Sequence, residues 1–73
     1  MLNVKVARRF DPQGVPSIST LLRSLEAQLG EHGRIVLRAS GTEALIRVMV
    51  EAEDEALARG CAEQLAAAVQ ASA

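Results

Sequence analysis

Two arginines enclose a short run of small and hydroxyl-bearing residues, and this run is the chain's best candidate for binding chemistry. Arg38 and Arg47 each carry a planar fork of N–H donors that matches the oxygens of a phosphate group two at a time. Between them, Ser40 and Thr42 supply hydroxyl groups that can donate hydrogen bonds. Gly41 has no Cβ, so its backbone can come close to a ligand and can adopt a positive φ. Together these residue types predict a binding site for an oxyanion.

The same residues also fit a plain hairpin turn, because Ser, Gly and Thr build many turns for conformational reasons alone. The flanking runs 34–38 and 45–51 are rich in β-formers and predict two antiparallel strands. One face of these strands collects aliphatic side chains, namely Ile35, Leu37, Ile46, Val48 and Val50. Arg38 and Arg47 then share the opposite face, where two converging cations repel each other unless an anion neutralises them. This convergence favours the anion site over the plain turn.

The residues before the hairpin predict a strand and a helix. Residues 2–6 alternate between apolar and polar and predict a half-buried strand, and residues 11–14 carry the proline and glycine of a turn. Pro16 suits the first turn of a helix, and Gly30 suits its C-cap. Apolar side chains recur between them at helical spacing, at Ile18, Leu21, Leu22, Leu25 and Leu29.

A second helix is expected after the hairpin. Glu53, Asp54 and Glu55 place negative charge where a helix N-terminus favours it, which explains this acidic run without a bound cation. An apolar stripe follows, made of Leu57, Cys61, Leu65 and Val69. The element order β-α-β-β-α predicts an α+β fold of two layers, with a mainly antiparallel sheet covered by two helices on one face.

Length and composition exclude several classes of protein. The chain has 73 residues, which is enough for one small domain. Its net charge is −1, so it does not produce the positive field that is typical of a nucleic-acid-binding protein. Phe10 is the single aromatic residue, so base stacking has almost nothing to use. Cys61 is the single cysteine and cannot form an internal disulfide. The sequence shows neither a membrane span nor a signal peptide, so we expect a soluble, cytoplasmic protein that binds neither nucleic acid nor membrane.

The hairpin residues resemble those of a known family. The C-terminal phosphate-binding loop of the α-D-phosphohexomutases has the pattern Arg-x-Ser-Gly-Thr-Glu-Pro-x-x-Arg, which this chain matches at Arg38, Ser40, Gly41, Thr42, Glu43 and Arg47. Ala44 stands where the family has proline, and this difference predicts a less preorganised exit from the loop. The continuation through residues 46–51 is most similar to the phosphoglucosamine mutase branch. The strand at residues 2–6 is similar to the one that opens the last domain in that branch.

The resemblance implies that residues 1–73 form a single domain, the C-terminal phosphate-binding domain of a larger phosphohexomutase with a TATA-binding-protein-like fold. It implies a site for the non-reacting phosphate of a phosphosugar, made of Arg38, Ser40, Gly41, Thr42 and Arg47. Glu43 is expected to support the loop by orienting an arginine or by capping loop amides, because an acid beside a phosphate would repel it.

For the parent enzyme, the resemblance implies interconversion of glucosamine 6-phosphate and glucosamine 1-phosphate. That reaction needs a phosphoserine and Mg²⁺, which in the family come from earlier domains. We therefore expect no catalytic residue, metal or cofactor on this chain and no catalysis by the chain alone. Its expected partners are the phosphosugar substrate, held by its phosphate, and the other domains of the parent enzyme.

The remaining reactive side chains have structural explanations. His32 has no second metal ligand nearby and is expected to be exposed. Cys61 falls on the apolar stripe and is expected to be an inert packing thiol. Arg8 and Arg9 are expected to be a solvated pair.

A second function stays open at the level of the sequence. A small non-catalytic module of the same α+β class, regulatory or protein-binding, would use the helices or the exposed sheet face and treat the Ser-Gly-Thr segment as a turn. Self-association through the open face without any response to phosphate would favour such a module. An enzyme in its own right would need a nucleophile paired with a base, and the sequence offers no such pair.

Overall fold

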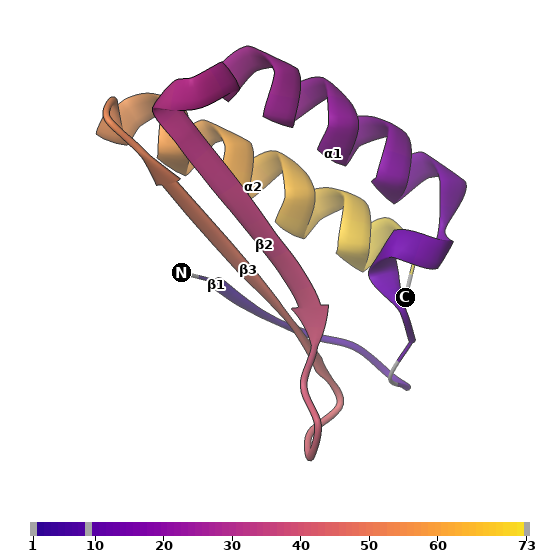
Figure 1. The fold of residues 1–73 in the computed structure, drawn as a ribbon. Coiled ribbons are helices and arrows are strands. Elements are labelled where there is room, and N and C mark those ends of the chain that lie inside the picture. The colour runs from indigo at the N-terminus through magenta and orange to yellow at the C-terminus, as the bar shows by residue number, and fades with distance from the viewer. Residues whose placement is uncertain (1, 9, 73) are drawn as a thin grey trace.

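The computed structural model describes residues 2–8 and 10–72 of the chain. In these residues three strands and two long helices follow one another in the predicted order β-α-β-β-α (Figure 1). The strands are β1 (Leu2–Lys5), β2 (Gly33–Ala39) and β3 (Leu45–Ala52), and the helices are α1 (Pro16–Leu29) and α2 (Glu55–Ser72). Two short 3₁₀ turns flank α1, namely η1 (Pro12–Gly14) and η2 (Gly30–His32).

The sheet has β3 at its centre, in the order β1-β3-β2. β2 pairs antiparallel with β3 from residue 46 to residue 52, whereas β1 pairs antiparallel only with residues 45–48. Both helices lie against one face of the sheet and leave the other face open (Figure 1). The hairpin loop between β2 and β3 extends beyond the rest of the molecule, away from the helices (Figure 1). This arrangement confirms the predicted α+β fold of two layers.

The core lies between the sheet and the helices. Its buried members are Val4, Val6, Ile18, Leu25, Leu29, Leu37, Ile46, Val48, Cys61, Ala62, Leu65 and Val69. The stripe predicted for the last helix is wrong at Leu57, whose exposed fraction is 37%, and Ala62 is buried on that helix in addition to the three other predicted positions. A spacing of four residues drifts by about 40° at each step around an α-helix, so the three steps from Leu57 to Val69 add up to about 120° and take Leu57 out of the face that meets the sheet.

The helix ends follow from local sequence. Pro16 occupies the first turn of α1, and Gly30 ends the helix with φ of 56° while its N–H donates to the carbonyl oxygen of Glu26. Asp54 caps α2, because its Oδ1 accepts hydrogen bonds from the amides of Ala56 at 2.9 Å and Leu57 at 3.2 Å. No described helix combines the length and the apolar content that crossing a bilayer requires.

The segment before α1 ties itself to the outer edge of β2. Gln13 Nε2 donates a hydrogen bond to the carbonyl oxygen of Leu37 at 3.1 Å. Asp11 Oδ1 in turn accepts from the backbone N–H of Gln13 at 3.0 Å and fixes the 3₁₀ turn that presents this side chain. The sequence predicts a turn here, but the contact joins residues 24 positions apart and has no local signal.

Candidate anion-binding site

The two arginines of the motif lie directly opposite each other on the open face of the sheet. Arg38 on β2 and Arg47 on β3 are register partners, and both are exposed. Side chains opposite each other in an antiparallel pair have Cβ atoms about 4.5–5.5 Å apart. Together with Val36 and Met49 the arginines line a shallow hollow of about 220 Å³. The structure therefore brings the predicted pair together on one face, as the alternation of the strands predicts.

The charge on this face changes along the ladder. Arg34 lies opposite Glu51, and its Nε is 2.8 Å from Glu51 Oε2, so this row is neutralised. At the loop end of the same ladder, Arg38 faces a second arginine, and no ion pair within residues 2–8 and 10–72 involves either of the two. Repulsion between exposed charges at this separation is roughly 1 kcal/mol in water, small enough to be tolerated. An anion placed between them would turn this repulsion into attraction.

Ser40 lies inside the loop. Its exposed fraction is 7%, and its Oγ accepts hydrogen bonds from the amides of Thr42 and Glu43, each at 3.3 Å. The amides of Thr42 and Glu43 thus point to the Ser40 oxygen in this structure. Bonds of 3.3 Å to a neutral hydroxyl are weak, so a charged phosphate oxygen would compete well for these amides. Ser40 therefore holds the loop in shape, and this function was not expected from the sequence.

Gly41 and Thr42 are exposed at the tip of the loop. Gly41 does not use its freedom to adopt a positive φ, because Gly30 is the one described glycine with such a backbone. A Cβ built at Gly41 would meet no heavy atom within 4 Å. The backbone therefore has open space at this point, into which a ligand can approach.

Because of this open space, a substitution at Gly41 should change ligand binding without changing the stability of the fold. We expect Gly41→Ala to leave the free energy of unfolding within about 0.5 kcal/mol of its original value, because the new methyl group contacts nothing. The same methyl group would stand where the ligand approaches, so we expect phosphate affinity to fall several-fold. Thermal unfolding and a phosphate titration measure the two effects separately. Gly60→Ala on α2, which also has nothing within 4 Å, is the control that should leave phosphate binding unchanged.

The exit of the loop is held by backbone hydrogen bonds. The N–H of Leu45 donates to the carbonyl oxygen of Glu43 at 2.9 Å, and the N–H of Val6 donates to that of Ala44 at 3.0 Å. The carboxylate of Glu43 is exposed and forms no ion pair with the described arginines. Within the described residues the Glu43 side chain therefore orients no arginine, and its backbone carbonyl oxygen accepts one hydrogen bond inside the loop.

The bond between Leu45 and Glu43 makes a γ-turn centred on Ala44. Since no described residue other than glycine has a positive φ, the turn is of the inverse type, with φ near −75° at its centre. Proline fixes φ at about −65°, so Ala44→Pro should fit without strain. We expect this change to raise stability by about 0.4–1 kcal/mol and the melting temperature by about 2–8 °C. A lower melting temperature by circular dichroism would show that the exit has a different backbone.

Of the residues given structural explanations, His32, Cys61 and Arg8 lie where those explanations require. His32 is exposed, with its Nδ1 3.2 Å from Glu53 Oε2, and Cys61 has an exposed fraction of 1%. Arg8 is exposed, and Arg9 lies outside the described residues. Within the described part of the chain, no group of three or more His, Cys, Asp or Glu side chains is placed to hold a metal ion.

A second hollow, of about 440 Å³, shares Arg38 with the first and was missed from the sequence. Its lining residues are Phe10, Asp11, Gln13, Leu37, Arg38, Ala39 and Ser40. Because these residues come from two distant segments, no local pattern signals the hollow. Val36 and Met49 were also missed, although their alternation with the arginines places them on the same face and is visible in the sequence.

Comparison with known proteins agrees with this arrangement. The family described as phosphoglucomutase/phosphomannomutase, C-terminal domain, matches residues 1–68. Among similar proteins, one from Marinobacter nauticus is 50% identical over 72 residues, 99% of this chain and 16% of its own length. One from Methylococcus capsulatus is 48% identical over 69 residues, 94% of this chain and 15% of its own length. Both are named phosphoglucosamine mutase.

The chain thus spans about one sixth of the length of these relatives and corresponds to a single part of them. The hairpin pattern, the β-α-β-β-α order and the family match over residues 1–68 agree with one another. The chain belongs to the phosphoglucomutase/phosphomannomutase family, as a C-terminal domain of that family.

Proposed function

We propose that this chain is the C-terminal domain of a phosphoglucosamine mutase, and that its hairpin binds the phosphate of the sugar that is not reacting. The observation that carries the proposal is the pairing of Arg38 with Arg47 across the ladder, beside an exposed loop and without a carboxylate partner in the described residues. Relatives of known name that share 46–50% of the sequence support the choice of enzyme.

The size of the hollow between Arg38 and Arg47 indicates which part of the substrate this domain would hold. A space of about 220 Å³ is smaller than the roughly 300–1,000 Å³ of sites that enclose a small molecule. It suits a phosphate group, while the sugar ring would be held by other parts of the enzyme. In this proposal the other domains also supply the phosphoserine and Mg²⁺. The hairpin contributes orientation, because binding energy from a remote group places the reacting end of the substrate.

Energetic considerations predict weak binding by the chain alone. Each arginine would form charge-assisted bonds worth roughly 1.5–3 kcal/mol, and the hydroxyl and amide donors would add nearer 1 kcal/mol each. Association and ordering of the loop cost several kcal/mol. The balance corresponds to a Kd of about 1 mM for a phosphosugar.

A titration of the isolated chain tests the proposal. Glucosamine 6-phosphate is added while the amide signals of the loop are followed by NMR, with unphosphorylated glucosamine as the control. We expect the amides of Thr42 and Glu43 to move most, because phosphate would take them from the Ser40 oxygen. Signals of Gly33, at the other end of the hairpin, should stay in place. Loop signals that do not move at tens of millimolar ligand would contradict the proposal.

The rival function, a protein-binding module, would use the open face of the sheet. On the β2–β3 ladder this face presents two partly buried apolar side chains, Val36 and Met49, between charged rows. So small an apolar area favours a polar ligand over a stable protein partner.

A further inference from the structure

The central strand is longer than its neighbour on one side. β1 pairs with β3 only from Lys5–Leu45 to Leu2–Val48, whereas β2 pairs with β3 as far as Ala52. On the β1 side, residues 50–52 of β3 are therefore paired with no strand in the described part of the chain.

The alternation of the ladder shows which groups this edge presents. The carbonyl oxygen of Ala44 bonds to Val6 on the β1 side, and that of Leu45 bonds to Ser40 on the β2 side. In an antiparallel sheet the direction alternates with each residue, so even-numbered residues of β3 point to the β1 side. The N–H and C=O groups of Val50 and Ala52 consequently face the side on which β1 has ended.

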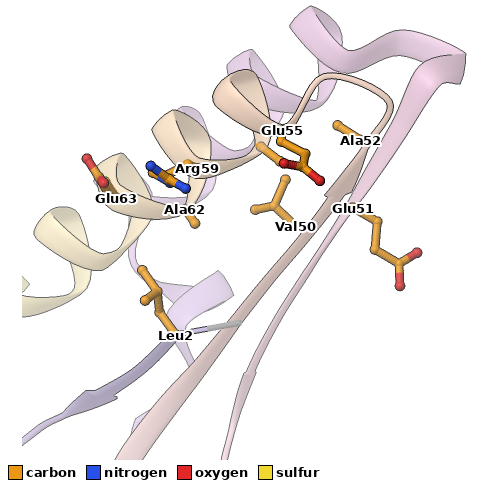
Figure 2. Close-up of a pocket in the computed structure, with 9 residues that line it drawn as sticks. Leu2, Val50, Glu51, Ala52, Glu55, Arg59, Ala62 and Glu63 are labelled. Carbon is orange, nitrogen blue, oxygen red and sulfur yellow. The ribbon is translucent and has the colours of Figure 1, made fainter.

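A groove of about 650 Å³ lies at this place, between the edge of β3 and α2. Its floor is apolar and small, with Val50 from the strand and Ala58 and Ala62 from the helix. Leu2 stands at one end with an exposed fraction of 39%, the largest of any large apolar side chain described. Figure 2 shows that Leu2 and Val50 both point toward α2, whereas Glu51 points away from it.

We infer that this groove takes the segment that precedes Leu2 in the full-length protein, which continues β1 as a strand along Val50 and Ala52. The relatives are about six times as long as the matched part, and the matched family is a C-terminal domain, so most of such a polypeptide lies upstream. That polypeptide enters the domain through the start of β1, which is the mouth of the groove. A strand that continues in the same direction needs no turn to reach the open hydrogen-bonding groups.

The register of β1 against β3 predicts which upstream residues would lie opposite Val50 and Ala52. Leu2 lies opposite Val48, so the residue two places before Leu2 would lie opposite Val50, and the residue four places before it would lie opposite Ala52. Because side chains alternate, both of these upstream residues would point toward α2, as Leu2 does. The first would pack on Ala58 and Ala62 and is expected to be apolar. The joined strand would fix the orientation of this domain on the preceding one, separately from phosphate binding.

Hydrogen exchange at single amides tests the inference. The chain is compared with a form that carries the eight residues encoded immediately upstream in its own gene. We expect the amides of Val50 and Ala52 to exchange at least about tenfold more slowly in the extended form. The amides of Met49 and Glu51, which point to β2, are the internal control and should change little. Equal exchange of Val50 and Ala52 in the two forms, or a gene that begins at residue 1, would overturn the inference.

Two variants identify the occupant. Ala58→Gln fills the groove from α2 and should remove the added protection, whereas Ala67→Gln on the exposed side of α2 should retain it. Protection that survives Ala58→Gln in a folded chain would contradict the inference. A second copy of the chain is the competing occupant. Protection of Val50 and Ala52 in the unextended chain that rises with protein concentration would establish the second copy and overturn the upstream segment.

Discussion

Replacing Arg47 with alanine is expected to weaken phosphate binding by about 10–150-fold, the equivalent of roughly 1.5–3 kcal/mol for a charge-assisted bond. In the isolated chain this loss would move the Kd from about 1 mM to about 10–150 mM. In the full-length enzyme it should lower kcat as well as kcat/KM, because a remote phosphate that is no longer held leaves the reacting end poorly oriented. Arg47→Lys retains the positive charge but loses the planar fork of donors. Its phosphate affinity should therefore lie between those of the original chain and of Arg47→Ala.

The open face supplies a matched control for this experiment. Arg34 is an exposed arginine on the same ladder, but its charge is already paired with Glu51 at 2.8 Å. Arg34→Ala removes an exposed ion pair worth about 0–1 kcal/mol and should leave phosphate binding unchanged. If Arg34→Ala and Arg47→Ala weakened binding equally, the effect would come from overall charge, and the proposed site would be wrong.

Leu65→Ala is expected to destabilise the fold by about 2–5 kcal/mol, because Leu65 has an exposed fraction of 0% and its truncation leaves a cavity beneath the sheet. A domain of this size has a total stability of about 4–11 kcal/mol, so the loss is a large part of it. The melting temperature should fall by roughly 10–30 °C. Circular dichroism of the helices is the suitable measurement, since the chain has neither tryptophan nor tyrosine.

Leu57→Ala is the matched control, with the same change on the same helix. Its exposed fraction of 37% predicts an effect within about 0.5 kcal/mol. Equal losses at Leu57 and Leu65 would mean that α2 packs with a different face toward the sheet. The pair of variants therefore tests the observation that Leu57 leaves the predicted apolar stripe.

Periodic features of this chain were predictable from sequence because their causes are local. The alternation of the two hairpin strands places Arg38 and Arg47 on one face, and their register in the structure agrees. Pro16 and Gly30 mark the ends of α1 because each has a backbone preference that suits its position. The order of elements follows from these local signals, whereas the central place of β3 is set by pairing between distant segments and was not predicted.

The details of the loop were less predictable. Ser40 has a hydroxyl group that can donate to a ligand or accept from its own loop, and residue type alone does not choose between them. In the structure it accepts from Thr42 and Glu43, so the loop is closed on itself. Gly41 was expected to allow a positive φ and a close approach of the backbone to a ligand, and in the structure only the open space around it is present. Both outcomes depend on the three-dimensional path of five residues, which propensities do not determine.

The contact of Gln13 with β2 has a consequence for how molecules of this protein behave at high concentration. The outer edge of β2 is the other border of the sheet, and unpaired borders invite neighbouring molecules to add strands and grow toward fibrils. The amide of Gln13 already occupies the carbonyl oxygen of Leu37 in the middle of this border. An incoming strand would have to displace that amide. We therefore expect the Gln13 side chain to disfavour strand addition at this edge.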